Sequence, residues 1–309
     1  MSENIGAGKG TEATSEKDLP SIAAWTVRGQ RFDWGKQTYL MGILNVTPDS
    51  FSDGGQFNTL DAAIVQAQHL IQSGAHLLDI GGQSTRPQSD PVSIEAELQR
   101  VIPVIQALRS NSISSSAINS IPISVDTTRA EVARAAIQAG ADLVNDISGA
   151  TYDPEMLPTV AELNVPIVLM HIRGTPKTMQ QLTDYADLVK EVYEFLMQRV
   201  EACIAAGISP DRIMLDPGIG FAKTYEQNLE LLRQTAQFRC SGYPVLIGTS
   251  RKSFIGHILQ QPDPKQRVLG TAATCCAAIA GGADVLRVHD VAELRDVCQV
   301  ADAIWRNSY

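Results

Sequence analysis

The stretch AGADLVNDISG, residues 139–149, contains the unit from which most of the sequence is built. Its Gly-Ala pair indicates the end of a helix, because glycine readily takes the left-handed conformation of a helix C-cap. The apolar run that follows is short and passes into polar residues at its carboxyl end. The same connection between a helix end and the next strand recurs as SGAH (73–76), AGIS (206–209) and GGAD (281–284). The sequence therefore predicts repeated units of helix followed by strand.

Apolar runs of this kind alternate with helical segments along most of the chain. The predicted helices cover residues 62–73, 131–139, 185–206 and 271–280, each followed by a glycine. The runs are nearly continuous in hydrophobicity, as strands covered on both faces require. They are LMGILNV (40–46), HLLDI (76–80), IPISVD (121–126), DLVND (142–146), PIVLM (166–170), RIMLD (212–216), YPVLIG (243–248) and DVLRV (284–288). Eight such units predict an α/β fold, a (β/α)8 TIM barrel. An open, doubly wound sheet is the alternative.

The segment before the first of these strands predicts an N-terminal β-hairpin. WTVRGQRF (25–32) and DWGKQTYL (33–40) both contain residues typical of strands. We expect this hairpin to close the end of the barrel that lies opposite the polar strand ends. Residues 1–20 are rich in Gly, Ser, Thr and charge, which predicts a flexible tail. Residues 21–309 are expected to form a single domain.

Composition excludes several classes of protein. The net charge is −9 with no basic run, which argues against a nucleic-acid partner. No apolar stretch is long enough to cross a membrane, and the first residues lack the apolar core of a signal peptide. The five cysteines form no C-x-x-C pair, which indicates reduced thiols. These features predict a cytoplasmic protein.

Polar and charged residues collect at the carboxyl ends of the predicted strands, where a barrel of this type builds its active site. Many polar residues at such ends are only helix N-caps, and this reading suits Thr127, Thr128, Ser148 and Asp153. It does not suit the cations, which cannot accept hydrogen bonds from a helix N-terminus. These cations are Arg251, Lys252, Arg287 and His289.

Two kinds of ligand group are suggested by these residues. Asp126, Asn145 and Asp216 offer acceptors, which pair well with a fork of N–H donors such as the edge of a pterin or guanine. The cations Arg86, Lys252, Arg287 and His289 suit a phosphate or diphosphate. A ligand with a heteroaromatic head and an anionic tail would use both. The carboxylates could instead be salt-bridge partners in the barrel core, and His171 fits a structural position equally well.

The motifs as a set resemble the dihydropteroate synthase family, over nearly everything from Tyr39 to Asp290. The resemblance is carried, in family order, by MGILNVTPDSFSDGG (41–55), DIGGQSTRP (79–87), SVDT (124–127), NDISG (145–149), MHIRG (170–174), DPGIGF (216–221), GTSRKS (248–253) and RVHD (287–290). It implies a transferase of folate biosynthesis and a target of sulfonamides. The family joins 6-hydroxymethyl-7,8-dihydropterin diphosphate to p-aminobenzoate and releases diphosphate. The resemblance also implies a homodimer.

The resemblance implies a role for each matching residue. Asn45 would give an oxygen to Mg²⁺ beside the diphosphate. The pterin ring would be held by Asp126, Asn145, Asp216 and Lys252, with Met170 and Arg86 also lining the substrate site. The diphosphate side would be lined by Thr85, Arg287, Val288 and His289, and the p-aminobenzoate site by Pro87, Phe221 and Ser250. Asp126, Arg287 and His289 are the residues expected to act in catalysis.

Two loops would close over the substrates, one from Thr47 and one from Gly81, with Phe51 or Phe57 shielding the reacting centre from water. The sequence departs from the common family pattern at Gln83, where Glu is usual, and at Ala222, where Gly is frequent. A pterin-binding methyltransferase domain and a pterin-binding relative without turnover are the alternative functions.

Overall fold

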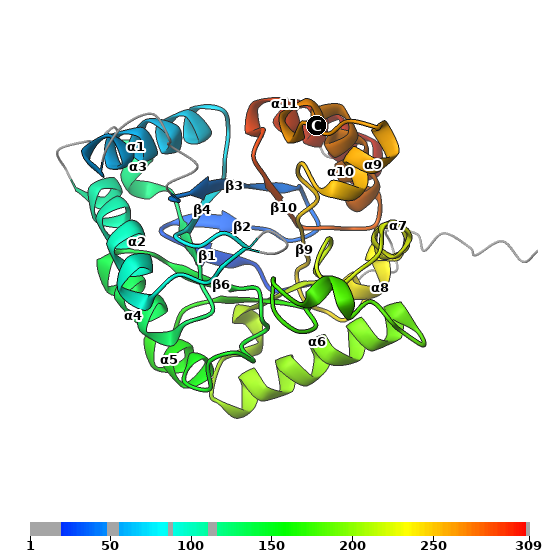
Figure 1. Ribbon diagram of the computed structural model, residues 1–309, viewed down its shortest axis with the longest axis horizontal. Coiled ribbons are helices and arrows are strands. Elements are labelled where there is room, and N and C mark those ends of the chain that lie inside the picture. Colours follow the sequence, from blue (N-terminus) through cyan, green and yellow to red (C-terminus); the bar gives the residue numbers. More distant parts are fainter. Residues whose placement is uncertain (1–19, 48–55, 86–88, 111–115, 307–309) are drawn as a thin grey trace, which may run out of the picture.

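The computed structural model describes residues 20–47, 56–85, 89–110 and 116–306. Eight parallel strands curl into a barrel, with hydrogen-bonded neighbours in the order β8-β7-β6-β5-β4-β3-β10-β9 (Figure 1). A parallel bridge between Leu215 and Val245 spans the last gap. The strands are β3 (Tyr39–Asn45), β4 (Leu77–Gly81), β5 (Ile123–Asp126), β6 (Leu143–Asp146), β7 (Ile167–Met170), β8 (Ile213–Asp216), β9 (Leu246–Ile247) and β10 (Val285–Val288). The predicted TIM barrel is confirmed, and each of the eight apolar runs overlaps one of its strands.

Helices surround the barrel and cover the outer face of the sheet (Figure 1). They are α1 (Gln56–Gln72), α2 (Ile94–Arg109), α3 (Ser116–Ser120), α4 (Ala130–Ala139), α5 (Met156–Leu163), α6 (Leu188–Ala205), α7 (Tyr225–Arg233), α8 (Thr235–Arg239), α9 (Ser253–Leu259), α10 (Val268–Ala280) and α11 (Val291–Trp305). Within the described residues, no helix is long and apolar enough to cross a membrane.

Glycine ends the predicted helices in most cases. Gly140 caps α4 with a φ of 115°, in the left-handed region that the Gly-Ala joint predicts. The predicted end of α10 before Gly281 is confirmed, but Gly281 is not left-handed, because its φ is −82°. The neighbouring Gly282 takes the left-handed conformation instead, with a φ of 86°. The sequence pair Gly-Gly could not indicate which of the two glycines makes the turn.

The strands alternate between two environments with a period of two residues, as β geometry requires. Side chains such as Leu78, Leu169 and Leu286 pack in the large core between the barrel and the helices. The intervening side chains point into the barrel. They are apolar near the strand starts, as with Leu143 and Met214, and form a separate core cluster there. The mouth of the barrel is the end at which the strands finish. The inward position two residues further along each strand lies close to this mouth, so strand geometry alone places residues 145 and 216 there.

The N-terminal hairpin is shorter than predicted. Its strands β1 (Trp25–Val27) and β2 (Gln30–Phe32) both lie within WTVRGQRF, paired antiparallel. Arg28 and Gly29 form the two-residue turn with φ values of 49° and 77°, the sign that hairpin turns of this length favour. The expectation that DWGKQTYL forms the second strand is wrong. Its last two residues, Tyr39 and Leu40, begin barrel strand β3 instead.

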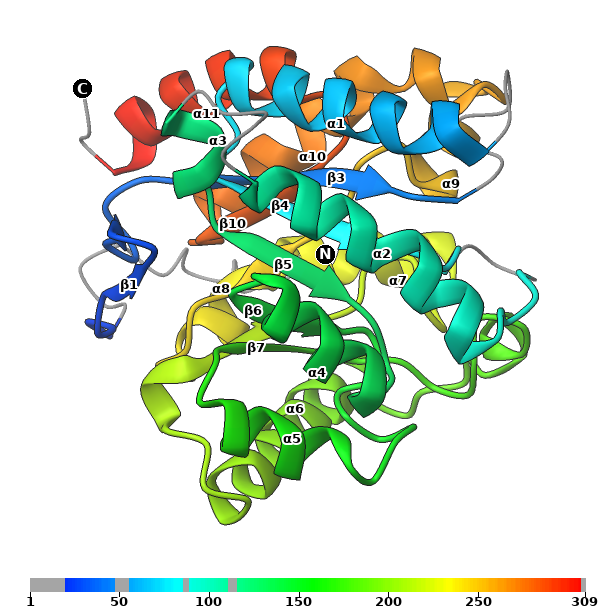
Figure 2. The same ribbon diagram turned by 90° about the vertical axis from the view of Figure 1, so that its left-hand side faces the viewer.

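The hairpin covers the end of the barrel from which the strands start, on the left of Figure 2. Trp25, Phe32 and Trp34 belong to the same buried cluster as the inward residues of the strand starts. The Phe32 ring stacks on Trp34 at 5.5 Å between centroids and also contacts Tyr39 at 4.8 Å. The predicted position of the hairpin, opposite the polar strand ends, is confirmed. The division into a tail and one domain stays a prediction, because residues 1–19 lie outside the described chain.

The hairpin gives a prediction that separates stability from function. Phe32 is 2% exposed, so Phe32→Ala removes a buried ring and should lower the free energy of unfolding by about 3–5 kcal/mol. Thr26→Ala, at an exposed position of the same hairpin, is the matched control and should change it little. Chemical denaturation measures both. A Phe32→Ala protein as stable as the control would show that the hairpin does not stabilise the barrel.

Candidate active site

The mouth of the barrel contains a buried layer of polar side chains directly above the apolar cluster. Each occupies an inward position near the end of its strand. Asp79 follows the apolar inward residue Leu77 and Arg287 follows Val285, whereas Asp126 follows the buried Ser124. The carboxyl and amide groups of this layer are at most 6% exposed. The layer consists of Asp79 (β4), Asp126 (β5), Asn145 (β6), Asp216 (β8) and Arg287 (β10).

Arg287 connects three strands of this layer. Its Nε donates to Asp79 Oδ2 at 2.6 Å, and its Nη2 donates to Asp126 Oδ2 at 2.8 Å. Asn145 Nδ2 donates to the same Asp79 oxygen at 3.1 Å. Burial works against the charged guanidinium, but Asp79 and Asp126 together raise the pKa of Arg287. The guanidinium is therefore a fixed positive charge held between two carboxyl groups.

Asp126 and Asp216 have raised pKa values, mainly because both are buried. The pKa of Asp126 is raised to about 7, where the nearby carboxyl group of Asp79 adds to burial and Arg287 opposes it. The pKa of Asp216 is raised to about 6, although the Gly218 amide donates to its Oδ1 at 2.7 Å. Perturbed pKa values of this size are frequent at functional sites. Either carboxylate would gain from a ligand that brings N–H donors or positive charge.

These pKa values predict an acid limb in the activity profile. Below about pH 7, first Asp126 and then Asp216 take up a proton and change from acceptors to donors, so kcat/KM for a substrate that donates hydrogen bonds to them should fall towards pH 5. The stability of the fold should change in the opposite direction to the activity, so it should fall as the pH rises. A carboxyl pKa above its ordinary 3.8 stabilises the fold at low pH, and this contribution is lost as pH rises through about 6–7. Initial rates and denaturation midpoints between about pH 5 and 8 test both, and an activity profile that is flat across this range would contradict the assignment.

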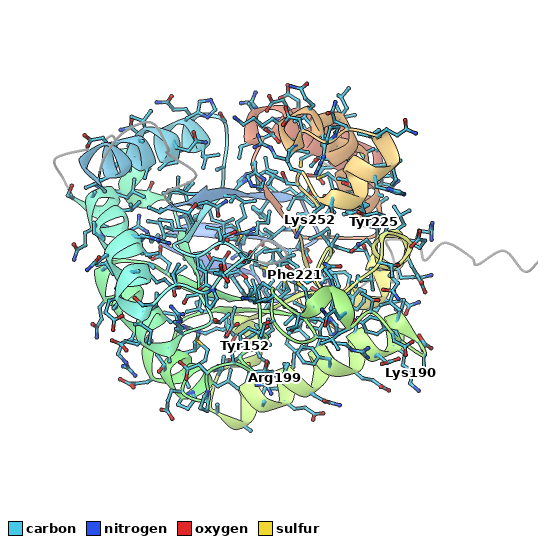
Figure 3. The ribbon with its side chains drawn as sticks, in the orientation of Figure 1. Tyr152, Lys190, Arg199, Phe221, Tyr225 and Lys252 are labelled. Atoms are coloured by element: carbon cyan, nitrogen blue, oxygen red, sulfur yellow. The ribbon has the colours of Figure 1, made fainter. Side chains whose placement is uncertain are left out.

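Lys252 and Phe221 form a cation–aromatic pair beside the polar layer. The Lys252 Nζ lies 4.2 Å from the centroid of the Phe221 ring, and Figure 3 shows both near the centre of the ring of helices. Burial and the charge of Arg287 lower the pKa of Lys252 to about 8. Met170 and Ile147 join Phe221 in a small apolar cluster. An aromatic surface and a positive charge are thus available next to the buried acceptors.

His289 and Ser250 are neighbours at the same mouth. Ser250 Oγ lies 2.9 Å from His289 Nδ1 and accepts a hydrogen bond from the His289 amide at 3.1 Å. The Arg251 side chain pairs through two nitrogens with Asp290, which is not part of the polar layer, and one of these contacts joins Nε to Oδ2 at 3.0 Å. Arg251 is therefore committed to a structural ion pair.

The helix-cap interpretation is confirmed only for Asp153, which bonds to the first amide of α4, whereas Thr127 and Ser148 bond to loop amides. Thr127 Oγ1 accepts from the Arg129 amide at 3.2 Å. Ser148 Oγ accepts from the Thr151 amide at 3.1 Å. Asp153 Oδ2 accepts from the Ala130 amide at 2.8 Å, at the start of α4. Thr128 lines a cavity, described next.

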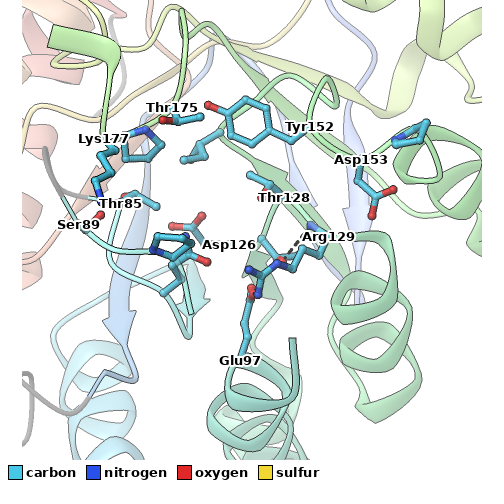
Figure 4. Close-up of a pocket in the computed structure, with 16 residues that line it drawn as sticks. Thr85, Ser89, Glu97, Asp126, Thr128, Arg129, Tyr152, Asp153, Thr175 and Lys177 are labelled. Carbon is cyan, nitrogen blue, oxygen red and sulfur yellow. Dashed lines mark hydrogen bonds and ion pairs between the residues drawn. The ribbon is translucent and has the colours of Figure 1, made fainter. Parts of the chain in front are cut away.

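A cavity of about 440 Å³ lies beside the polar layer and meets it at Asp126 (Figure 4). Thr85 of the loop after β4 also lines it, together with residues of the loops after β5, β6 and β7. An ion pair between Arg129 Nη1 and Glu97 Oε2, at 2.7 Å, lies on its wall. The cavity extends the mouth outward from Asp126, whereas the other groups of the polar layer lie deeper along the barrel axis.

Not all of the predicted site residues point into this mouth. The Val288 side chain packs in the core between the barrel and the helices, because its neighbour Arg287 takes the inward position. Val288 can therefore meet the site only through its backbone, and its place on the diphosphate side stays a prediction. Arg86, Pro87 and the loop with Phe51 lie outside the described residues, as does the Phe57 side chain. Asn45 ends β3, half-buried and opposite Gly81.

Comparison with known proteins agrees with this geometry. A family model described as "Pterin binding enzyme" matches residues 41–289. The chain belongs to this pterin-binding enzyme family. A dihydropteroate synthase of Synechocystis is 62% identical over 275 residues, which cover 89% of this chain and 93% of the relative.

Solved dihydropteroate synthases have the same fold. The Xanthomonas albilineans enzyme with 4-aminobenzoic acid has a TM-score of 0.83 at 43% identity, covering 91% of this chain and 97% of that one. The same organism's enzyme in complex with 7,8-dihydropteroate has a TM-score of 0.80 at 41% identity, covering 91% and 98%. The resemblance found in the sequence motifs is confirmed.

Within the pterin-binding family, the departure at Ala222 has a structural consequence. Ala222 has a φ of 52°, in the left-handed region where glycine is the usual residue. Its carbonyl accepts from the Tyr185 hydroxyl at 3.0 Å, and the residue is fully buried. The chain therefore adopts the glycine conformation here with an alanine. The other departure, Gln83, lines the cavity.

Two residues of the site were not singled out from the sequence. Asp79 is fully buried and holds both Arg287 and Asn145. Lys223 is 2% exposed and lies under the turn that carries Phe221. A signal existed for Asp79, since it is a charged residue inside the otherwise apolar run HLLDI. Lys223 follows the glycine-rich turn directly, but nothing in the sequence indicates that its side chain turns inward.

Proposed function

We propose that this site carries out the dihydropteroate synthase reaction, in which 6-hydroxymethyl-7,8-dihydropterin diphosphate and p-aminobenzoate give 7,8-dihydropteroate and diphosphate. The observation that carries the proposal is the buried polar layer, which places acceptors on β5, β6 and β8 beside the guanidinium of β10. The Synechocystis relative with this name, which is 62% identical, supports it.

The pterin would bind to the acceptors of the layer. Its aminopyrimidinone edge offers several N–H donors on one side, and carboxylates bind such forks well. Asp126, Asn145 and Asp216 supply oxygens from three strands whose positions the barrel fixes. Lys252 would donate to the ring oxygen or nitrogen from the other side. Met170 would provide apolar contact with the ring.

The diphosphate would lie towards Arg287, His289 and Thr85. Mg²⁺ usually binds through one or two protein oxygens together with substrate phosphates, and the single amide of Asn45 at the end of β3 suits that mode. Among the described residues there is no group of three or more His, Cys, Asp or Glu side chains that could hold a metal ion. When bound, Mg²⁺ would offset the charge that develops on the leaving diphosphate.

Bond cleavage would release the diphosphate with the electron pair of the C–O bond. The exocyclic methylene of the dihydropterin becomes electron-deficient, and the ring spreads the positive charge. The carboxylates of Asp126 and Asp216 lie fixed and buried where they stabilise such a cation. The amine nitrogen of p-aminobenzoate then bonds to the methylene and gives up one proton. An aniline nitrogen is already nucleophilic, so no strong general base is needed.

The amine substrate would occupy the region of Phe221 and Ser250. The Phe221 ring offers a stacking surface for the benzoate ring, and the Lys252 Nζ beside it offers positive charge. Ser250, with its contact to His289, connects this region to the diphosphate side. Pro87, which lies outside the described residues, is proposed to complete the subsite.

The proposed role of Asn45 predicts a change in metal requirement. Asn45→Ala should raise the Mg²⁺ concentration for half-maximal rate about tenfold or more, because an oxygen contact to the ion is lost. The KM for p-aminobenzoate, whose subsite lies elsewhere in the mouth, is the internal control. A metal titration of initial rates measures both. An unchanged Mg²⁺ requirement would remove Asn45 from the metal site.

The function itself is tested by diphosphate release. Purified protein is mixed with dihydropterin diphosphate, with and without p-aminobenzoate, and diphosphate is measured over time. We expect release that depends on the amine and is inhibited by a sulfonamide. The two alternatives give different results: a pterin-binding methyltransferase domain or a non-catalytic relative would bind the pterin and release no diphosphate when the amine is added.

The assembly and location of the protein are also proposals. We propose a homodimer, as the family resemblance implies, and a cytoplasmic enzyme whose partners are its small-molecule substrates, without nucleic acid or membrane. The net charge of −9 and the lack of a basic run support the last point. Light scattering on the purified chain measures the oligomeric state, and a single mass near 33.4 kDa would contradict the dimer.

A further inference from the structure

The turn after β8 carries Phe221 and is held from below by a buried lysine. Lys223 is 2% exposed, and its Nζ donates to the Phe221 carbonyl at 2.8 Å. The same Nζ lies 3.0 Å from Nδ1 of His171, which follows β7. His171 is also 2% exposed, and its amide donates to the Asp216 carbonyl at 3.0 Å. Lys223 thus connects the loops that follow two neighbouring strands.

The protonation of the pair follows from its surroundings. Burial lowers the pKa of His171 to about 2, so its imidazole is neutral and Nδ1 is able to accept from the lysine. Burial also lowers the pKa of Lys223 to about 7, while the charge of Asp216 works in the opposite direction. The His171 ring is fixed in turn by an edge contact with Phe195, at 4.9 Å between centroids. The acceptor that Lys223 meets is therefore rigid.

The backbone of the turn is tight and leaves little freedom for Phe221. Gly218 has a φ of +74°, and a Cβ at this position would lie 2.0 Å from the His171 carbonyl oxygen. At Gly220, also left-handed, a Cβ would meet the Lys252 side chain at 2.9 Å. The Gly220 amide donates to Asn228 Oδ1 at 2.6 Å. A small movement of residue 221 would therefore change how its ring meets Lys252.

We propose that Lys223 is a positioning residue of the aromatic-amine subsite: by joining the Phe221 carbonyl to the His171 ring, it fixes the Phe221 ring against Lys252. Lys223 is buried beneath the turn and acts through Phe221 without touching the substrate. The inference rests on the proposed function, since it takes Phe221 to line the site for p-aminobenzoate.

The test compares Lys223→Met with wild type and with Lys190→Met, an exposed lysine on the outer side of α6 (Figure 3). The loss of the hydrogen bond from the buried Lys223 amine to the Phe221 carbonyl should raise the KM for p-aminobenzoate about tenfold. The KM for dihydropterin diphosphate should stay within about twofold, because Asp126 and Asn145 lie on other strands and Asp216 keeps its hydrogen bond from the Gly218 amide. Lys190→Met should match wild type in both constants. Equal increases in both KM values for Lys223→Met would overturn the proposal.

A double-mutant cycle separates positioning from a general structural effect. If Lys223 acts through the Phe221 ring, Lys223→Met should add little to the KM for p-aminobenzoate once Phe221→Ala has removed the ring. Full additivity of the two changes would contradict the proposal. Lys223→Gln keeps one N–H donor and should recover most of the affinity, which gives a second variant if Lys223→Met folds poorly. The wild-type assay with and without p-aminobenzoate is run first, so that a failure of the proposed function is recognised independently of any variant.

Discussion

Asp126→Asn should lower kcat by about 10²–10³-fold while weakening pterin binding about tenfold or less. Asparagine keeps the shape and one acceptor oxygen, so much of the hydrogen bonding to the pterin edge survives. What it lacks is the negative charge opposite the developing cation, an interaction that strengthens only in the transition state. The buried position of Asp126, 6% exposed beside Arg287, makes that charge effective.

The measurement for this variant needs both constants. Single-turnover rates give the chemical step, and equilibrium titration with the pterin substrate gives its affinity. Asp296→Asn, an exposed carboxylate on α11, is the matched control and should leave both unchanged. Equal losses in turnover and in pterin affinity would show that Asp126 only binds the substrate.

Arg287→Met should abolish measurable turnover and also destabilise the fold. The substitution leaves Asp79 and Asp126 buried without their shared cation, and breaking a buried pair of this kind costs about 3–5 kcal/mol. The diphosphate also loses its fixed guanidinium. Because Asp126, whose pKa is already raised to about 7, would take up a proton, the stability of the variant should recover as the pH falls from about 8 to 6. Denaturation curves at several pH values measure this recovery.

A second substitution separates the two effects of losing Arg287. In Arg287→Met combined with Asp79→Asn, one buried charge is gone, so most of the stability should return while turnover does not. Asp79→Asn alone serves as the control. Asparagine has the shape of the Asp79 side chain, which accepts hydrogen bonds from Arg287 and Asn145. A stability loss in Arg287→Met that is the same at every pH would contradict the account of two uncompensated carboxylates.

The sequence predicts the strands better than the contacts between them. The continuous apolar runs indicate β5 and β10 directly, and the period of two then explains why Asp126 and Arg287 both face inward. The ion pair of Arg287 with Asp79 joins residues 208 positions apart, and no local pattern indicates such a partner. For the same reason the sequence motifs alone could not separate Arg287 from Val288, which the strand turns towards the helices.

The other differences have local causes. The predicted hairpin extends too far along the chain, because strand-favouring residues continue to Thr38 and Tyr39, whereas the turn is the pair Arg28-Gly29. Lys223 was passed over because a lysine after a glycine-rich turn is ordinarily a solvent-exposed residue. Its burial depends on His171, which comes from a different strand end.

The central claim is that the polar layer at the barrel mouth joins the two substrates. Dihydropteroate and diphosphate are to be quantified in the same samples for wild type, Asp126→Asn and Phe32→Ala. The account predicts equal amounts of the two products from wild type and from folded Phe32→Ala, whose change lies at the far end of the barrel. It predicts that Asp126→Asn loses both products together. Diphosphate without dihydropteroate, or full dihydropteroate formation by Asp126→Asn, would contradict it.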